Sequence, residues 1–177
     1  MVELRTERLL LRRPEHSDLE DLHQVFSDPA AMRYWSTLSH TDPAQTEAFI
    51  AAMQGAHDRR GSEFVVELAG RAIGKAGIWD AMEIGFILHR DFWGRGIGTE
   101  AASAVIDHGF TTMGLQQITA DVDPRNAASL RLLAGLGFEE TGREKATLML
   151  GDEVCDSIYL AVSHARWMQT RPRQIRN

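Results

Sequence analysis

The segment from Phe92 to Ala101, which reads Phe-Trp-Gly-Arg-Gly-Ile-Gly-Thr-Glu-Ala, constrains the fold of this chain more than any other stretch. It follows an apolar run from Ile84 to Leu88 and opens a long alanine-rich pattern typical of a helix. Glycines let the backbone approach a ligand closely, and the free N–H groups at a helix start attract an anion. The sequence therefore predicts a strand, a glycine turn and a helix start that together bind a phosphate group.

The spacing of the glycines decides which phosphate ligands to consider. A Walker loop, Gly-x-x-x-x-Gly-Lys-Ser/Thr, does not occur in the sequence. The dinucleotide fingerprint Gly-x-Gly-x-x-Ala is satisfied by residues 96–101, and Asp121 follows where a ribose-binding acid is expected. A dinucleotide fold, however, carries this motif in its first strand–helix turn, whereas only about 80 residues follow it here. A dinucleotide-dependent oxidoreductase therefore stays as an alternative only.

Hydrophobic periodicity and turn residues predict the order of helices and strands. We expect strands at about residues 9–13, 64–68, 72–79, 82–88, 115–122, 148–149 and 157–162, and helices at about 17–26, 42–60, 98–113 and 126–136. This order gives antiparallel neighbours in the first half and one parallel crossover beside the glycine turn. The sequence thus predicts an α/β (α+β) fold with a mixed, mostly antiparallel sheet of about seven strands.

Three motifs occur in order along roughly residues 5–163. They are Thr6 to Arg12, the glycine turn, and Asn126-Ala127-Ala128-Ser129 running on to Leu136-Gly137-Phe138 and Gly142. Together they resemble the GNAT superfamily of N-acetyltransferases, in particular the branch that acetylates ribosomal-protein N-termini (RimJ/RimL type). Gly96 and Gly98 take the glycine positions of that family's pyrophosphate loop, Arg/Gln-x-x-Gly-x-Gly/Ala. Trp93 stands at the Arg/Gln position, a departure from the general pattern that looks like this branch.

The resemblance implies a GNAT-like sheet with helices on both faces, and acetyl-CoA as co-substrate without a metal. The pyrophosphate is then expected on a loop of five residues, mainly through backbone N–H groups: Arg95, Gly96, Ile97, Gly98 and Thr99. The resemblance also places the pantetheine arm and the thioester oxygen on the backbone of Phe86, Ile87 and Leu88. Against this stands a simpler interpretation, in which the glycines only shape a tight turn and Arg95 is a solvated surface charge.

Two side chains are candidates for proton transfer. Glu83 begins the apolar strand before the loop, where partial desolvation would suit a general base acting through a water. A glutamate in this strand is also where many GNAT enzymes place their base, although Glu83 could instead be a strand-edge charge facing solvent. Asn126 would ordinarily cap a helix, because Asn is among the best N-cap residues, and Ser129 would be an ordinary first-turn residue. The resemblance adds a CoA contact for Asn126 and proton donation to the leaving thiolate for Ser129.

Composition limits the classes of partner. At 177 residues the chain suits one acetyltransferase domain, with a core at about 5–163 and a basic tail at 164–177. The net charge of −6 argues against a dedicated nucleic-acid binder. A single cysteine, no long apolar run and no signal-peptide pattern favour a cytoplasmic protein without a membrane contact. We expect a monomer or homodimer that acts on an amine substrate, either a small molecule or a protein N-terminus.

The predicted reaction is direct attack of the amine on the bound thioester in a ternary complex. A non-catalytic CoA-binding module is the alternative from another class. Cys155 offers a rival mechanism, since a cysteine could carry the acetyl group. Its acidic neighbours Glu153 and Asp156, and its distance along the chain from the glycine loop, argue against that role.

Overall fold

An eight-stranded sheet organises the part of the chain that the computed structural model describes, residues 2–60, 62–79 and 82–171. The strand order is β1-β2-β3-β4-β5-β6-β8-β7. All neighbours run antiparallel except β5 and β6. The strands are β1 (Leu4–Arg5), β2 (Leu9–Arg12), β3 (Glu63–Leu68), β4 (Arg71–Trp79), β5 (Glu83–Leu88), β6 (Gln117–Val122), β7 (Glu139–Leu150) and β8 (Glu153–Ser163). The mixed, mostly antiparallel sheet is confirmed, with one strand more than expected.

In the described residues, five α-helices and two short 3₁₀ helices accompany these strands. They are η1 (His16–Asp18), α1 (Leu19–Phe26), α2 (Pro43–Arg60), η2 (Arg90–Phe92), α3 (Ile97–Thr111), α4 (Ala127–Gly135) and α5 (His164–Thr170). The first helix begins with a capping box between Glu15 and Asp18 rather than at Ser17. Gly61, expected to end the second helix, lies outside the described residues.

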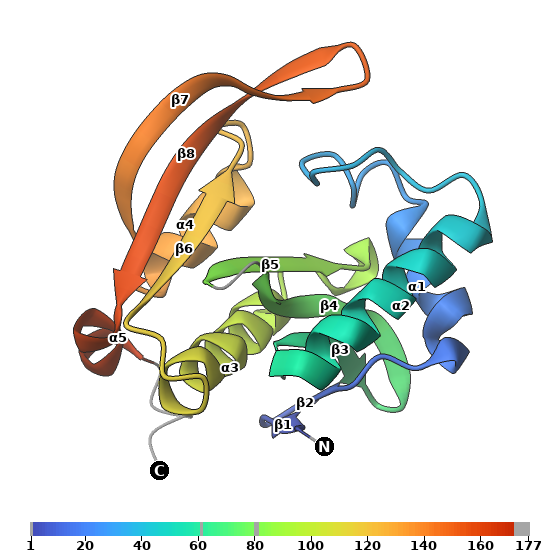
Figure 1. Ribbon diagram of the computed structural model, residues 1–177, viewed down its shortest axis with the longest axis horizontal. Coiled ribbons are helices and arrows are strands. Elements are labelled where there is room, and N and C mark those ends of the chain that lie inside the picture. The colour runs from blue at the N-terminus through green and yellow to red at the C-terminus, as the bar shows by residue number, and fades with distance from the viewer. Residues whose placement is uncertain (1, 61, 80–81, 172–177) are drawn as a thin grey trace.

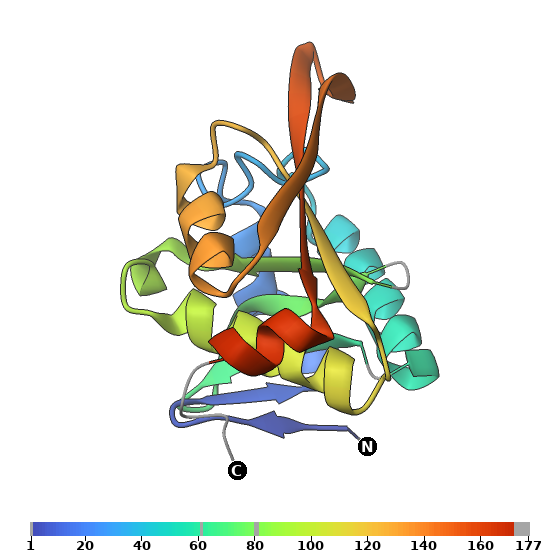
Figure 2. The ribbon, with the colours of Figure 1, turned by 90° about the vertical axis from the view of Figure 1, so that its left-hand side faces the viewer.

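The helices cover both faces of the sheet (Figures 1 and 2). Alternation along β3 shows the division, because Phe64 and Val66 pack in the same cluster as helix α3, whereas Val65 packs with α1 and α2. Neighbouring strands continue this pattern, with Ile87 on the α2 face and Leu88 on the α3 face. Strand β5 contributes residues to both hydrophobic clusters, so it is anchored on both faces and can support a site.

The sheet opens between β5 and β6. Glu83 and Thr119 form the register pair between these parallel strands, and the Thr119 N–H donates to the Met82 carbonyl, 2.9 Å away. Beyond this point the two strands diverge, as the separation of β5 from β6 in Figure 1 shows. Backbone groups on the facing edge of β5 are therefore left for a ligand.

The hairpin of β7 and β8 is much longer than the sequence indicated. We expected strands only at 148–149 and 157–162, but β7 runs over 12 residues and β8 over 11. Most of β7 is exposed on both faces, so it lacks the apolar alternation by which a half-buried strand is recognised. Register shifts between Glu140 and Gly142 and between Glu144 and Leu148 interrupt the pairing further.

The tail expected at 164–177 begins with a packed helix. Trp167 of α5 is fully buried, and its indole donates a hydrogen bond to Asp107, 3.0 Å away. Arg171 also pairs with Asp107. The segment expected as a basic tail is therefore packed against the domain up to Arg171, because one buried tryptophan ties the helix to α3. Residues 172–177 lie outside the described part.

Two features are absent from the described residues. No described helix is long and apolar enough to cross a membrane. Within the same ranges, no group of three or more His, Cys, Asp or Glu side chains is placed to hold a metal ion.

Candidate active site

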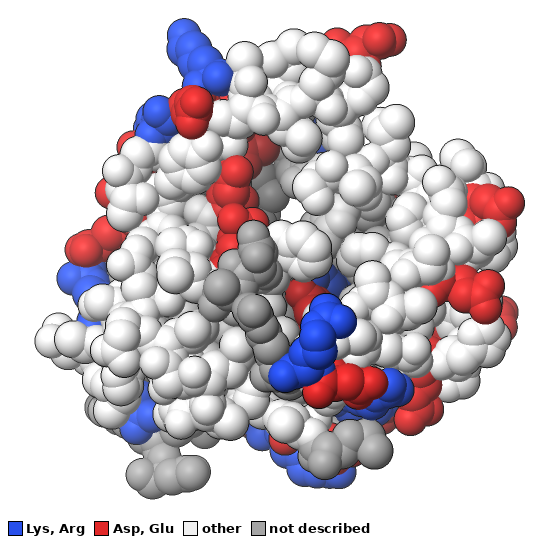
Figure 3. Space-filling model, viewed as in Figure 1, with Lys and Arg blue, Asp and Glu red and all other residues white. Residues whose placement is uncertain are grey.

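A cavity of about 1290 Å³ lies where the sheet opens. Its walls come from β5, the start of α4, helix α2, the segment between α1 and α2, and the β8 side of the long hairpin. Figure 3 shows this face hollowed near its centre, with acidic side chains along one wall, and Asp121, Asp123 and Asp156 are among the residues that line the cavity. The wall facing a bound molecule is thus partly apolar and partly acidic.

Strand β5 presents its backbone to this cavity. The His89 N–H donates to the Ile73 carbonyl at 2.8 Å, and antiparallel pairs alternate between bonded and non-bonded. Ile87 is therefore bonded to β4, whereas Phe86 and Leu88 direct their N–H and carbonyl groups toward the gap. The Leu88 carbonyl accepts a hydrogen bond from the Trp93 indole, 2.9 Å away. Trp93, which replaces the family's usual Arg or Gln, thus fixes the end of β5 to the loop.

The glycine loop forms the start of helix α3. Gly96 is the N-cap in the left-handed region, φ +74°, and Gly94 has φ +70°, conformations that favour glycine. Gly96 has no side chain to cap the helix, so N–H groups of its first turn are left for an anion. The expected loop from Arg95 to Thr99 therefore has the geometry of a phosphate site. Arg95 itself is exposed, and its guanidinium lies 5.8 Å from the centre of the Phe92 ring.

Glu100 points away from this anion site. Its carboxylate accepts hydrogen bonds from the backbone N–H of Arg8 at 2.9 Å, from the Arg8 guanidinium at 2.7 Å and from the Thr6 hydroxyl. Burial acts to raise the pKa of Glu100, but these hydrogen bonds outweigh it and hold the pKa below its ordinary value. The first sequence motif thus serves to anchor the loop, since Arg8 also donates to the Arg95 carbonyl at 3.0 Å.

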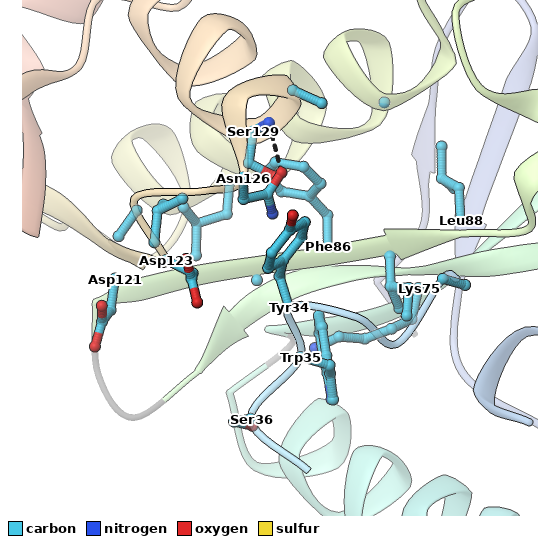
Figure 4. Close-up of a pocket in the computed structure, with 18 of the residues that line it drawn as sticks. Tyr34, Trp35, Ser36, Lys75, Phe86, Leu88, Asp121, Asp123, Asn126 and Ser129 are labelled. Carbon is cyan, nitrogen blue, oxygen red and sulfur yellow. Dashed lines mark hydrogen bonds between the residues drawn. The ribbon is translucent and has the colours of Figure 1, made fainter. Parts of the chain in front are cut away.

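Asn126 and Ser129 face the cavity from the start of α4. Asn126 is the N-cap of the helix, and its side-chain oxygen accepts a hydrogen bond from the Ser129 N–H at 3.1 Å (Figure 4). Both residues line the cavity. The ordinary capping role is therefore confirmed, and it leaves the amide nitrogen of Asn126 and the hydroxyl of Ser129 placed for a ligand.

Glu83 lies at the point where β5 and β6 part. It lines the cavity, is half-buried and pairs in register with Trp79 on one side and Thr119 on the other. The structure thus brings Glu83, the β5 backbone, the glycine loop, Asn126 and Ser129 to one cavity, although they span residues 83–129.

The segment between α1 and α2 supplies the opposite wall. Tyr34 points into the cavity toward Asn126, and Trp35 lies beside Lys75 (Figure 4). Met32, which belongs to the same aromatic stretch, is instead buried in the core. A network of charges ties this segment to the hairpin: Glu153 accepts from Arg33 at 2.9 Å and also from Arg125, which pairs with Asp123.

The cavity is also lined by Cys155, Lys75 and Glu63, which the sequence did not place at the site. Cys155 lines the cavity and its sulfur lies 3.5 Å from Arg125, so the argument from its distance along the chain was wrong. Lys75 and Glu63 form a buried ion pair on the α2 face and also line the cavity. A lysine inside the otherwise apolar strand β4 was the signal that could have revealed this pair.

Comparison with known proteins identifies this arrangement. The sequence pattern of the acetyltransferase (GNAT) domain matches residues 8–139, which is most of the chain and includes β5, the glycine loop and the Asn126 cap. The chain belongs to the GNAT acetyltransferase family. The predicted family and fold are therefore confirmed, and the sheet does not have the doubly wound parallel form of a dinucleotide-binding fold.

Three relatives illustrate the range of this family. The chain is similar to an uncharacterized N-acetyltransferase, p20, of Bacillus licheniformis, at 35% identity over 80% of this chain and 85% of the relative. It is 26% identical to the spermidine N(1)-acetyltransferase of Escherichia coli K12, over 89% of this chain and 87% of the relative. Among solved structures, Mycobacterium smegmatis RimJ in complex with CoA-disulfide is 26% identical, covers 96% of this chain and 90% of its own, and superimposes with a TM-score of 0.78. The similarity to RimJ agrees with the branch that the motifs indicated.

Proposed function

We propose that this GNAT domain transfers the acetyl group of acetyl-CoA to a primary amine, either of a small molecule or of a protein N-terminus. The observation that carries the proposal is the opening between β5 and β6, which leads directly to the glycine loop at the start of α3. A CoA molecule has a pyrophosphate and an amide-rich arm. The glycine loop supplies N–H donors that match the pyrophosphate, and the opening along β5 supplies N–H donors that match the arm.

Backbone groups and side chains would together hold acetyl-CoA. Backbone N–H groups from Arg95 to Thr99 bind the pyrophosphate, and the facing edge of β5, through Phe86 and Leu88, binds the pantetheine arm and polarises the thioester carbonyl. Ile87 contributes its side chain to the cavity, and Asn126 offers its amide nitrogen to the arm. The site needs no metal in this scheme, because the backbone donors supply the polarisation.

Transfer proceeds in one step from a ternary complex. The amine nitrogen attacks the thioester carbon, the carbon–sulfur bond breaks, and the electron pair leaves on sulfur. Glu83 accepts the proton of the amine through a water. Ser129 donates a proton to the thiolate and is reprotonated by water, to which Glu83 releases its proton. Glu83 lies where the strands part and lines the same cavity as Ser129, which supports this division of roles.

The test is release of the CoA thiol from acetyl-CoA in the presence of single primary amines, amino acids and short peptides. We expect amine-dependent release with at least one of these groups, and mass spectrometry should find the acetyl group on the amine. Binding of CoA without release for any acceptor would favour a non-catalytic CoA-binding module instead.

A further inference from the structure

A fully buried ion pair lies in the wall of the cavity opposite the start of α4. The Lys75 ammonium is 2.8 Å from Oε2 of Glu63, and the two side chains are only 5% and 3% exposed. Burying two charges costs desolvation that their attraction barely offsets, and apolar replacements of such pairs are often equally stable. Stability therefore gives no sufficient reason for this pair, and a role in binding has to be considered.

One oxygen of this pair is left over. Oε1 of Glu63 is buried and has no hydrogen-bond partner among the residues that the structure describes. A buried carboxylate oxygen without a donor is costly, and such groups are rare in folded proteins. Glu63, Lys75 and Trp35 all line the cavity, so a molecule bound there can supply the missing donor once the neighbouring side chains move enough to expose Oε1.

Two glycines make room on the sheet for the side chains of this pair and of Trp35. Gly77 lies opposite Glu63 in the register, and Gly85 lies opposite Gly77 on β5. A Cβ atom at Gly77 would be 2.7 Å from Oε2 of Glu63, and one at Gly85 would be 3.8 Å from Nζ of Lys75. The glycines thus leave room for the Glu63 carboxylate over β4 and for the Trp35 ring and Lys75 ammonium over β5. The three side chains therefore extend from the ion pair to the strand that carries the proposed reaction centre, about 10 Å at the usual strand spacing.

The charges select the kind of group that fits. An ammonium at this point would be repelled by Lys75, and a carboxylate would be repelled by Glu63. A neutral donor meets neither penalty, and the Trp35 ring, 5.3 Å from the Lys75 ammonium, adds a flat apolar wall. An amide N–H or a hydroxyl is the chemistry that satisfies Oε1.

We infer that Glu63, Lys75 and Trp35 form an acceptor subsite that binds a neutral amide or hydroxyl group near the amine to be acetylated. This inference rests on the proposed function. It selects amide-bearing acceptors, such as amino-acid amides or peptide N-termini, over acceptors with a second ammonium group. Glu63 is here a specificity-determining residue, because its carboxylate binds the acceptor away from the reacting atoms.

The experiment compares acceptors that differ only in whether one group, an amide or an ester, carries N–H donors. Aminocarboxamides with one to four methylenes between amine and amide are paired with the corresponding methyl esters, and kcat/KM is measured by thiol release from acetyl-CoA. For at least one chain length, the wild type should prefer the amide by about tenfold or more, as expected when a site loses its hydrogen-bonding partner. Equal values for amide and ester at every length, or a clear preference for diamines of the same length, would overturn the subsite.

Variants then locate the preference. The double variant Glu63→Met, Lys75→Met removes both charges at similar volume, and the ratio of amide to ester should fall to about one while acetyl-CoA affinity stays within about threefold. Glu63→Gln, which keeps the shape, should lower the same ratio. The matched control is Glu67→Gln, because Glu67 of the same strand pairs with Arg12, 2.6 Å away, and does not line the cavity.

The outcomes separate the two proposals. Absence of thiol release with every wild-type acceptor contradicts the proposed function, whereas release without any preference for the amide contradicts only the subsite. A preference for the amide over the ester that persists in Glu63→Gln or in the double variant also contradicts the subsite. The wild-type ratio decides the matter even where a variant does not fold.

Discussion

Gly98 lies in the first turn of α3, where the loop faces the cavity. A Cβ atom there would lie 3.2 Å from Leu132 and 3.7 Å from Leu88, so the position is tight as well as close to the proposed pyrophosphate. We predict that Gly98→Glu lowers acetyl-CoA affinity by at least about a hundredfold, because it places a carboxylate against an anion. Isothermal titration calorimetry measures this. The control is Gly135→Ala in α4, where no atom lies within 4 Å of the added Cβ. Equal affinity in both variants would move the site elsewhere.

Glu83 is the residue on which the proposed chemistry depends most. We predict that Glu83→Gln lowers kcat about a hundredfold, the usual scale for loss of a general base, while acetyl-CoA binding is retained. The acid limb of the pH–rate profile should disappear with it. Steady-state kinetics from pH 5 to 9 check both effects, and an unchanged profile would assign deprotonation to another group.

Residue types alone predicted the Asn126 cap but not every side-chain partner. Asn126 was recognisable as an N-cap because the cap is a local interaction within three residues. Glu100 forms an ion pair with Arg8, 92 positions away, and Glu63 of β3 forms an ion pair with Lys75 of the neighbouring strand β4. Such partners depend on sheet register, which a single sequence does not specify.

At the level of elements, a charge network joins the segment between α1 and α2 to the long hairpin. Hydrogen bonds from Arg33 and then Arg125 lower the pKa of Glu153 from 4.5 to about 2. Because the folded-state pKa is depressed, the bridge stabilises the protein above pH about 4.5 and loses its effect as the pH falls toward 2. The bridge is exposed to solvent, so its effect on global stability is small.

We predict that Glu153→Gln loosens the hairpin locally. Amides near residues 150–155 should exchange with solvent at least about threefold faster at pH 7, with little change in Tm. The difference from wild type should shrink as the pH is lowered toward 3. Glu140→Gln is the matched control, since the Glu140–Arg143 pair lies within β7 and does not connect the hairpin to another element. Identical exchange in the two variants would show that the network does not hold the hairpin.

Elements with a strong periodic pattern were predictable, and elements held by tertiary contacts were not. The strands β3 to β6 and the helix α3 lie within a few residues of their expected positions, because buried apolar residues mark them. The first half of β7 is polar and exposed, and α5 depends on one buried Trp167. Neither carries a periodic signal in the sequence.

For the whole molecule, the open question is how the acetyl group moves. The fold brings Cys155 to the cavity, so an acetyl-cysteine intermediate has to be tested rather than dismissed on chain distance. We predict that Cys155→Ser keeps at least about half of the wild-type kcat, because direct attack in a ternary complex does not use the thiol. Initial rates at varied acetyl-CoA and amine should give intersecting double-reciprocal plots. Parallel plots, or an acetylated Cys155 found without acceptor, would contradict direct transfer.

We propose that the opening between β5 and β6, which ends at the glycine loop, binds the acetyl donor. A crystal structure of the protein with acetyl-CoA tests it most directly. We predict the pyrophosphate on the N–H groups between Arg95 and Thr99, the arm along the free edge of β5, and the sulfur on the side of Ser129. Acetyl-CoA bound outside the gap between β5 and β6, with its pyrophosphate away from Gly96 and Gly98, would contradict the claim.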